Sequence, residues 1–267
     1  MIGPAPAKIN LALVVGPRRA DGKHELATVF QRVDLGDRIT VEPAAETTVE
    51  GFPADTIVRS ALASLDPERA WRVRIEKHTP VAAGLGGGSS DAATALRLAN
   101  AQLAIPKPVD ELHALATQAG ADVPFFLEDG PQLGTGDGTV LEPLDLPQDF
   151  VVLLLLPKNV AKQSTAQVYA AFDERGGEQG FEQRLATLRA ALAAVRRPRD
   201  LAALPANDLM SSPLSTELVA EGAFRADVTG AGPTVYGLFH SIADAQRAGR
   251  ALRRFGRTWV TVPAWYG

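Results

Sequence analysis

The most informative stretch of this chain reads Pro80-Val81-Ala82-Ala83-Gly84-Leu85-Gly86-Gly87-Gly88-Ser89-Ser90-Asp91. Four glycines within five positions let backbone N–H groups approach a ligand closely. Apolar residues then recur at helical spacing between Ser90 and Leu103, so a helix follows the glycines. The free N–H groups and positive dipole end of such a helix favour an anion. We therefore predict a phosphate-binding loop, with Gly87 at positive φ and close to the phosphate.

Two familiar phosphate loops are excluded by the residue at position 89. A Walker A loop needs a lysine after its last glycine, and a dinucleotide-binding loop needs a third glycine there. The chain has Ser89 instead. A flexible surface hinge is the alternative, but glycine runs rarely stand at the start of a well-patterned helix.

Composition narrows the class of protein. The 267 residues are 22% charged and 46% hydrophobic with a net charge of −4, which indicates a globular chain and argues against a nucleic-acid partner. The absence of cysteine excludes thiol chemistry and fits a reducing cytoplasm. The four histidines are scattered, so a histidine-ligated metal is not expected. The longest apolar run, residues 150–156, is too short for a bilayer, and no signal peptide or membrane association is expected.

Periodicity predicts an α+β fold. Strands are expected at 8–13, 38–42, 71–76, 150–156, 227–229, 234–239 and 259–262, and helices at 55–65, 90–103, 109–119, 164–172, 181–195 and 241–255. The stretch 130–147, punctuated by glycine and proline, is expected to be a connection. We place a domain boundary near residues 146–149, a proline-containing connection with few apolar residues, with domains at 1–147 and 148–267.

Two charged residues stand out in restrictive contexts. Lys8 shares one face of its strand with Asn10, while Ile9, Leu11 and Leu13 face the core. Asp122 lies in Gly120-Ala121-Asp122-Val123-Pro124-Phe125-Phe126, a rigid turn beside two aromatic rings. A carboxylate there needs a cation or hydrogen bonds to offset desolvation. Each segment alone is also compatible with a plain turn aspartate and a surface lysine.

Three turns carry weaker signals. Residues 19–26 contain Asp21-Gly22 and indicate a hairpin. The glycine turn Thr229-Gly230-Ala231-Gly232-Pro233-Thr234 is either a tight β-turn or a second source of backbone donors for the same phosphate. Asn207-Asp208-Leu209 is compatible with an ordinary turn. Gly120 is expected to end its helix in the left-handed conformation.

Together and in this order, these pieces resemble the GHMP kinases. Three segments carry the match: Pro6-Ala7-Lys8-Ile9-Asn10-Leu11, the glycine loop and the turn at 229–234. Further markers are Arg19-Ala20-Asp21-Gly22-Lys23-His24, Asp34-Leu35-Gly36-Asp37 and the Asp122 segment. They resemble the branch of the family that phosphorylates the C2 hydroxyl of a cytidine-diphosphate-linked alcohol in non-mevalonate isoprenoid biosynthesis. The resemblance implies an N-terminal half like domain 2 of ribosomal protein S5 and a ferredoxin-like C-terminal half.

The resemblance also implies roles for individual residues. Lys8 and Asp122 match the catalytic pair. The positions matching the ATP site are Pro80, Val81, Ala82, Ala83, Gly84, Leu85, Gly86, Gly87, Gly88, Ser89, Ser90, Gly230 and Gly232. Those matching the substrate site are Asn10, His24, Thr165 and Tyr169. ATP is the implied cofactor with Mg²⁺, for which Ser90 is the candidate ligand, and the enzyme is expected to be a cytoplasmic monomer or homodimer.

The chain departs from the family pattern at two places. Lys23 stands where an aromatic residue is usual, so Tyr169 alone is expected to stack on the cytosine. Ala231 stands where a hydroxyl residue is usual. A GHMP kinase acting on homoserine, mevalonate or a sugar is one rival, disfavoured by the Asp122 segment. A non-catalytic binding protein of the same fold is the other, disfavoured by the presence of both Lys8 and Asp122.

Overall fold

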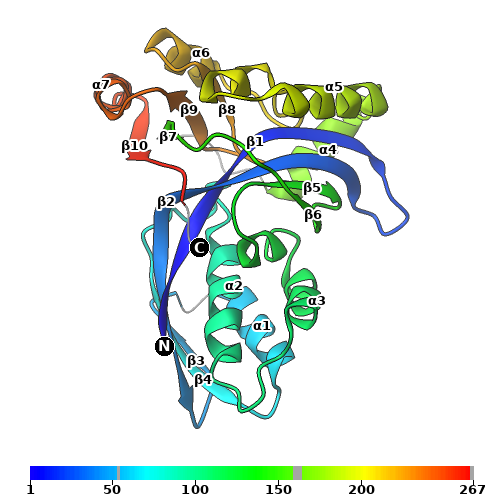
Figure 1. Ribbon diagram of the computed structural model, residues 1–267, viewed down its shortest axis with the longest axis vertical. Helices are drawn as coiled ribbons and strands as arrows, with labels where there is room; N and C mark the ends of the chain where they lie inside the picture. The colour runs from blue at the N-terminus through cyan, green and yellow to red at the C-terminus, as the bar shows by residue number, and fades with distance from the viewer. Residues whose placement is uncertain (53–54, 159–163, 265–267) are drawn as a thin grey trace.

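The structure is a computed structural model that describes residues 1–52, 55–158 and 164–264. Figure 1 shows two sheets with helices packed against them, where η denotes a short 3-10 helix. In chain order the elements are β1 (Ile2–Arg18), β2 (His24–Ala44), β3 (Thr48–Glu50), α1 (Ile57–Leu65), β4 (Ala70–Glu76), α2 (Gly87–Asn100), α3 (Val109–Ala119), η1 (Pro124–Leu127), β5 (Gln132–Gly136), β6 (Val140–Pro143), β7 (Val151–Pro157), α4 (Thr165–Glu174), α5 (Phe181–Ala194), η2 (Pro198–Ala203), α6 (Pro213–Ala220), β8 (Arg225–Val228), β9 (Val235–Phe239), α7 (Ile242–Leu252) and β10 (Gly256–Thr261).

The first sheet is built around the long antiparallel hairpin β1–β2. Its order is β3-β4-β2-β5-β6, with β1 also paired to β2. The hairpin turn closes where the N–H of Gly22 donates to the Arg19 carbonyl, as its Asp-Gly signal predicts. Helices α1, α2 and α3 lie on one face of this sheet (Figure 1) and bury a core that includes Trp71, Leu96 and Phe125.

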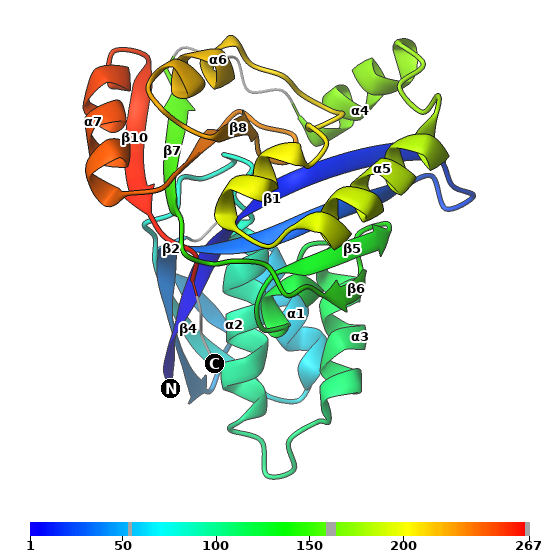
Figure 2. The same cartoon turned by 45° about the horizontal axis from the view of Figure 1, so that its top comes forward.

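The second sheet has the antiparallel order β10-β7-β9-β8 and is covered by α6 and α7. Helix α5 packs along β1 (Figure 2). One core cluster joins Ile9 and Leu11 of β1 to Leu154 and Tyr236 of the second sheet. Strand β1, which belongs to the first sheet, therefore also packs against the second sheet. The division of the chain into domains at 1–147 and 148–267 stays a prediction. In the described parts of the chain, no helix has the length and apolar character to cross a membrane.

The α+β class and the order of strands and helices are confirmed. The expected alternation in β1 holds from Lys8 to Leu11, but a register shift between Asn10 and Ala12 places Leu13 in the cavity with Lys8 and Asn10 and not in the core of Ile9 and Leu11. Lys8 and Asn10 are only 4% exposed because the glycine loop and the second sheet cover the face that they share. Residues 130–147, expected to be a connection, contain the hairpin β5–β6. Its strands are short and carry several glycines, which masks the alternation. Helix α6 was also missed.

Two glycine expectations were wrong. Helix α2 begins at Gly87, so the chain has already turned at Gly86, and Gly87 is helical without a positive φ. Gly120 ends α3 with φ 167°, which is extended rather than left-handed. Its carbonyl accepts from the N–H of Val123, which starts the tight turn through Asp122. That new turn, rather than a left-handed cap, redirects the chain.

Candidate active site

The charged pair at the centre of the site is formed by Lys8 and Asp122. The backbone N–H of Lys8 donates to the Leu85 carbonyl at 2.9 Å, which joins β1 to the glycine loop. The Lys8 Nζ lies 3.3 Å from Oδ2 of Asp122, whose side chain is 35% exposed and accessible to a ligand. The tertiary structure thus supplies the cation that the turn aspartate needs.

Asn10 holds the Lys8 ammonium from the other side. The Lys8 Nζ donates to Oδ1 of Asn10 at 2.8 Å. Asn10 Nδ2 donates to the Thr28 hydroxyl at 2.7 Å, and that hydroxyl donates to the Ala12 carbonyl at 2.8 Å. This chain of hydrogen bonds orients the amide, so the lysine has a defined position and not a range of rotamers.

The glycine loop enters α2 through two residues in the left-handed conformation. Gly84 has φ +79° and Gly86, the N-cap of α2, has φ +69°. A Cβ on Gly84 would lie 2.6 Å from the Thr229 carbonyl oxygen, and one on Gly86 would lie 2.9 Å from Cγ of Lys8. Both positions therefore require glycine for conformation and for space.

The loop lines a cavity of about 450 Å³. Among the described residues, no side chain caps the N-terminus of α2, which leaves the first N–H groups of the helix open to an anion. All the expected loop residues from Pro80 to Ser89 line this cavity. Ser90 does not line it: the residue is fully buried, and its hydroxyl has no hydrogen-bond partner among the described residues.

A buried charge cluster joins the two ends of the loop. The Lys77 Nζ lies 2.7 Å from Oδ2 of Asp37 and 2.7 Å from Oδ2 of Asp91, which belongs to α2. Asp37 also accepts from the N–H groups of His78 and Thr79, just before the loop. One cluster therefore fixes the entry and the exit of the glycine loop to β2.

This cluster holds two carboxylates around one ammonium. Burial raises the pKa of Asp91 to about 7; the Lys77 ammonium opposes this shift and the nearby Asp37 carboxylate reinforces it. The pKa of Lys77 is also raised, because attraction to both carboxylates outweighs its burial. The Asp91 carboxyl therefore changes its charge within the neutral pH range.

The turn at 229–232 lies against both Lys8 and the glycine loop. The Thr229 hydroxyl accepts from the N–H of Asn10 at 3.1 Å and lies 3.2 Å from its Oδ1. Gly230 and Gly232 have φ +57° and +71°, and both line a second cavity of about 490 Å³ together with Lys8. The turn is thus part of the site as well as a link between β8 and β9.

A third cavity, of about 550 Å³, is lined by His24, Thr165 and Tyr169. The His24 ring stacks on Tyr169 at 4.8 Å between centroids, and its Nε2 lies 2.7 Å from Oδ1 of Asp173. One face of the Tyr169 ring is therefore covered by the imidazole. Burial, with the nearby Asp122 charge, raises the pKa of Tyr169 to about 12, so its phenol stays protonated.

Lys23 lines the same cavity and is anchored to a residue that the sequence did not single out. Its Nζ lies 2.5 Å from Oδ2 of Asp137, in the turn between β5 and β6. Burial alone would raise the pKa of Asp137, but hydrogen bonds from Lys23 and Thr139 outweigh it and lower the pKa to about 2. The ion pair thus lines the cavity at the position where the family usually has an aromatic ring.

The three cavities adjoin one another, and the cavity lined by Lys8 and Asp122 connects the other two. Asp122 lines both the cavity with Lys8 and the cavity with His24, while Gly84 and Gly86 line both the Lys8 cavity and the loop cavity. Thr165, the first residue of α4, lines all three. A cation and a carboxylate thus stand where a phosphate loop and a second ligand pocket meet.

Comparisons with known proteins identify the family. Residues 55–130 match the family described as GHMP kinases N terminal domain, and residues 214–258 match GHMP kinases C terminal. A 4-diphosphocytidyl-2-C-methyl-D-erythritol kinase of Anaeromyxobacter sp. (strain Fw109-5) is 39% identical over 93% of this chain and 85% of its own. The chain belongs to the 4-diphosphocytidyl-2-C-methyl-D-erythritol kinase family.

Solved structures agree with membership of this kinase family. A crystal structure of 4-(cytidine 5'-diphospho)-2C-methyl-D-erythritol kinase matches with a TM-score of 0.77 and 31% identity, over 99% of this chain and 100% of the other. A mevalonate kinase of Methanococcus jannaschii matches with a TM-score of 0.75 over 99% and 98% of the two chains but is only 13% identical, which shows the fold alone. The expectations of a GHMP fold and a kinase are confirmed, against the non-catalytic rival.

Sequence reasoning missed several residues of this kinase site. Asp37 was quoted only as part of a family marker, although it carries the charge cluster. Lys77, Thr28 and Asp137 gave no signal, because each acts through a partner distant in sequence. Asn207 was interpreted as an ordinary turn residue but is buried among backbone groups of the 229–232 turn.

Proposed function

We propose that this kinase transfers the γ-phosphoryl group of ATP to the C2 hydroxyl of 4-diphosphocytidyl-2-C-methyl-D-erythritol, in non-mevalonate isoprenoid precursor biosynthesis. One observation carries the proposal: the cavity that holds Lys8 and Asp122 shares Gly84 and Gly86 with the loop cavity and shares Asp122 and Tyr169 with the aromatic-lined cavity. Transfer between two bound molecules requires their reacting ends to meet in this way.

The loop side of the site suits ATP. Its phosphates would lie at the open N-terminus of α2, where glycines permit close approach and the helix dipole favours negative charge. Gly230 and Gly232 bring a second glycine turn to the adjoining Lys8 cavity, which shares Gly84 and Gly86 with the loop cavity. The GHMP kinases are ATP-dependent enzymes, and the expected ATP residues from 80 to 89 border this space.

The ion pair suits activation of an alcohol. Asp122 would accept the proton of the attacking hydroxyl, which a carboxylate can do only while ionised. Lys8 would hold that carboxylate in place through the 3.3 Å contact and would stabilise the oxygen as it attacks. Asn10 would orient the lysine through its 2.8 Å contact with Nζ. Positioning and charge neutralisation are what phosphoryl transfer chiefly requires.

The aromatic side of the site suits a cytosine base. An ionised Asp173 at 2.7 Å requires the hydrogen of a neutral His24 ring to be on Nε2, which makes Nδ1 an acceptor. An acceptor complements the exocyclic amino group of cytosine. Tyr169 would provide a flat surface beside it, and Thr165 would border the diphosphate between base and ion pair.

Mg²⁺ is proposed to accompany ATP. The Asp122 carboxylate is a hard oxygen donor at the cavity, whereas the Ser90 hydroxyl, the expected ligand, is fully buried and does not line the loop cavity. A carboxylate of this kind fits a cation that keeps several waters and is held mainly through phosphate oxygens. When bound, Mg²⁺ would neutralise charge on the phosphates.

The proposal needs only small-molecule partners. We propose no nucleic-acid partner, in keeping with the net charge of −4, and a cytoplasmic enzyme that acts as a monomer or homodimer. The use of ATP and a nucleotide-linked substrate supports that location.

The test is a comparison of acceptors. The purified enzyme would be given ATP with the cytidine-diphosphate alcohol, homoserine or mevalonate, and phosphate transfer to each would be measured. We expect kcat/KM to be highest for the cytidine-diphosphate alcohol, by at least about 100-fold, since the other two leave the base pocket unfilled. Preference for homoserine or mevalonate, or ATP hydrolysis without transfer, would refute the assignment.

A further inference from the structure

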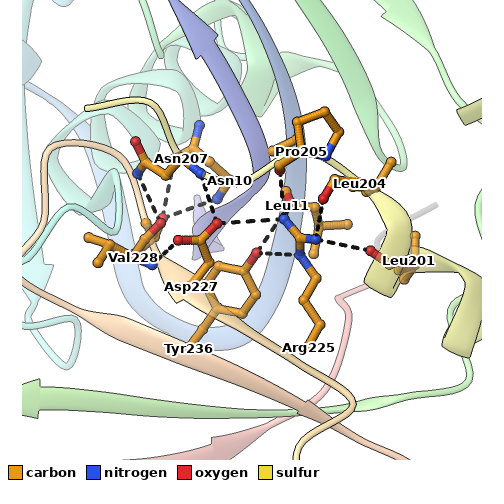
Figure 3. Close-up of polar contacts among 12 residues, drawn as sticks. Asn10, Leu11, Leu201, Leu204, Pro205, Asn207, Arg225, Asp227, Val228 and Tyr236 are labelled. Carbon is orange, nitrogen blue, oxygen red and sulfur yellow. Dashed lines mark hydrogen bonds and ion pairs between the residues drawn. The ribbon is translucent and has the colours of Figure 1, made fainter. Parts of the chain in front are cut away.

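A buried polar network connects Asn207, Asp227, Arg225 and Tyr236 (Figure 3). At one end of it, the Arg225 guanidinium is 7% exposed. The guanidinium lies 3.6 Å from the carboxylate of Asp227. Its donors go to the carbonyls of Leu11, Leu201, Leu204 and Pro205 and to the Tyr236 hydroxyl. Arg225 thereby joins β1, the segment after η2 and the second sheet.

Asn207 forms the other end of this network. Its Nδ2 donates to the Val228 carbonyl at 3.0 Å and to the Gly230 carbonyl at 2.7 Å. Its Oδ1 accepts from the N–H groups of Leu209 and Met210. Its own N–H donates to Asp227 at 2.9 Å. The side chain is thus saturated: one donated bond goes to Val228, the last residue of β8, and the other goes to Gly230 of the glycine turn.

The turn held in this way touches the reacting groups on its opposite side. A Cβ on Gly230 would lie 3.4 Å from Oδ1 of Asn10 and 3.6 Å from Nζ of Lys8. On the loop side, a Cβ on Gly84 would lie 2.9 Å from the Gly232 carbonyl oxygen. The turn is therefore wedged between the lysine and the glycine loop, and Asn207 fixes it from behind.

The energetics favour one position of the turn. Loss of the Asn207 donors would leave two backbone carbonyls without these partners, and a buried unpaired group carries a desolvation cost. The Thr229 hydroxyl anchors the start of the turn, because it accepts from the N–H of Asn10, but Gly230 and Gly232 have no side chains to hold them. The position of these glycines relative to Lys8 then depends on backbone bonds, and Asn207 supplies those to Val228 and Gly230.

We propose that Asn207 is a positioning residue of the kinase: its buried amide sets the distance between the 229–232 turn, Lys8 and the glycine loop that ATP phosphates require. The inference rests on the proposed ATP site but adds a residue outside it. Asn207 touches neither Lys8 nor the loop and acts through Val228 and Gly230. Its loss should affect ATP more than the acceptor alcohol.

The test compares Asn207→Ala with Asn100→Ala. Asn100 is a matched control, 7% exposed against 8% for Asn207. Its amide also donates to a backbone carbonyl and accepts a backbone N–H, both of Lys107, at the end of α2 opposite the glycine loop. Both variants should lose thermal stability. Only Asn207→Ala should weaken ATP binding by calorimetry and lower kcat/KM for ATP, by about 10- to 100-fold, since small misplacements have such effects.

The acceptor provides the second readout. We expect KM for the alcohol to change by less than about twofold in Asn207→Ala, because its pocket lies on the far side of the ion pair. Equal ATP affinities in the two variants, or equal losses for ATP and acceptor, would overturn the proposal. If Asn207→Ala does not fold, Asn207→Ser decides. Its hydroxyl can replace one donated bond, so an ATP affinity below that of the parent supports the proposal and parental affinity overturns it.

Failure of the proposed function would be recognised separately. Calorimetry with ATP needs no acceptor, so it reports on Asn207 even if the parent enzyme does not phosphorylate the cytidine-diphosphate alcohol. If the parent enzyme transfers phosphate to the alcohol and Asn207→Ala binds ATP as tightly as the parent, only the positioning role of Asn207 is refuted.

Discussion

Replacing Gly86 by alanine would displace Lys8, the proposed catalytic lysine, which is in direct contact with it. Gly86 is the N-cap of α2 with φ +69°, and the added Cβ would lie 2.9 Å from Cγ and 3.1 Å from Cε of Lys8. A third contact, 3.0 Å from the added Cβ to Cζ of Phe126, prevents the Cβ from moving away from Lys8 on that side. Contacts this short require movement, and the Lys8 side chain is the flexible neighbour. Its Nζ would leave the 3.3 Å contact with Asp122.

The chain offers a closely matched control for the backbone strain. Gly180 is the N-cap of α5 with φ +70°, and its added Cβ would meet only Nη1 of Arg184, at 3.7 Å. Both substitutions place alanine in the left-handed region, at a cost of roughly 1–2 kcal/mol. Each kcal/mol lowers Tm by about 2–4 °C in a chain of this size. The two variants should therefore lose similar stability from strain.

Activity separates the two variants. We expect Gly86→Ala to lower kcat by about 10- to 100-fold, because a displacement of the order of 1 Å at a reacting group has that effect. Gly180→Ala should keep the parental kcat. The assay is steady-state kinetics with both substrates, with Tm measured on the same preparations. A kcat in Gly86→Ala within twofold of that in Gly180→Ala would refute the assigned role of Lys8.

Three further outcomes are expected. Asp122→Asn keeps the shape but cannot accept a proton, so kcat should fall by about 100- to 10,000-fold with ATP affinity unchanged in calorimetry; a near-parental kcat would leave Asp122 a structural turn residue. Lys23→Tyr should lower KM for the cytidine substrate by about tenfold through base stacking, less the loss of the Asp137 pair, with KM for ATP as control; if Lys23→Ala lowers that KM as much, stacking is not the cause. Because burial raises the pKa of Asp91 to about 7, the parent should gain unfolding free energy as pH falls from 8 to 5, whereas Asp91→Asn should lack that gain in denaturant titrations at each pH; parallel curves would contradict it.

Local patterns were enough to predict most elements of this fold. The alternation in residues 8–13, the glycine run before an apolar stripe, and the Asp-Gly turn each depend on neighbours within a few positions. Such signals predicted β1, α2 and the first hairpin correctly. They failed at β5–β6, where short strands interrupted by glycine do not show a period.

The candidate site could be predicted only in part. The glycine loop could be predicted as an anion site, because the backbone N–H donors at the start of a helix do not depend on a distant part of the chain. Lys8 and Asp122 were each compatible with a surface lysine and a turn aspartate until the family resemblance paired them. The roles of Lys77, Asp137 and Asn207 could not be predicted, since each depends on a hydrogen-bond partner 14 to 114 positions away in the chain.

The sequence by itself therefore determined which segments can turn tightly, form a helix or accept an anion, because those properties follow from φ, ψ and hydrogen bonding within a few residues. The tertiary structure decided which charges meet. Folding the chain brings Asp122 to Lys8, Asp37 and Asp91 to Lys77, and Asn207 to the turn at 229–232. A buried charge or amide is stable only with its partners in place. Those partners lie far apart in the chain, so their assembly is a property of the packed core rather than of any segment.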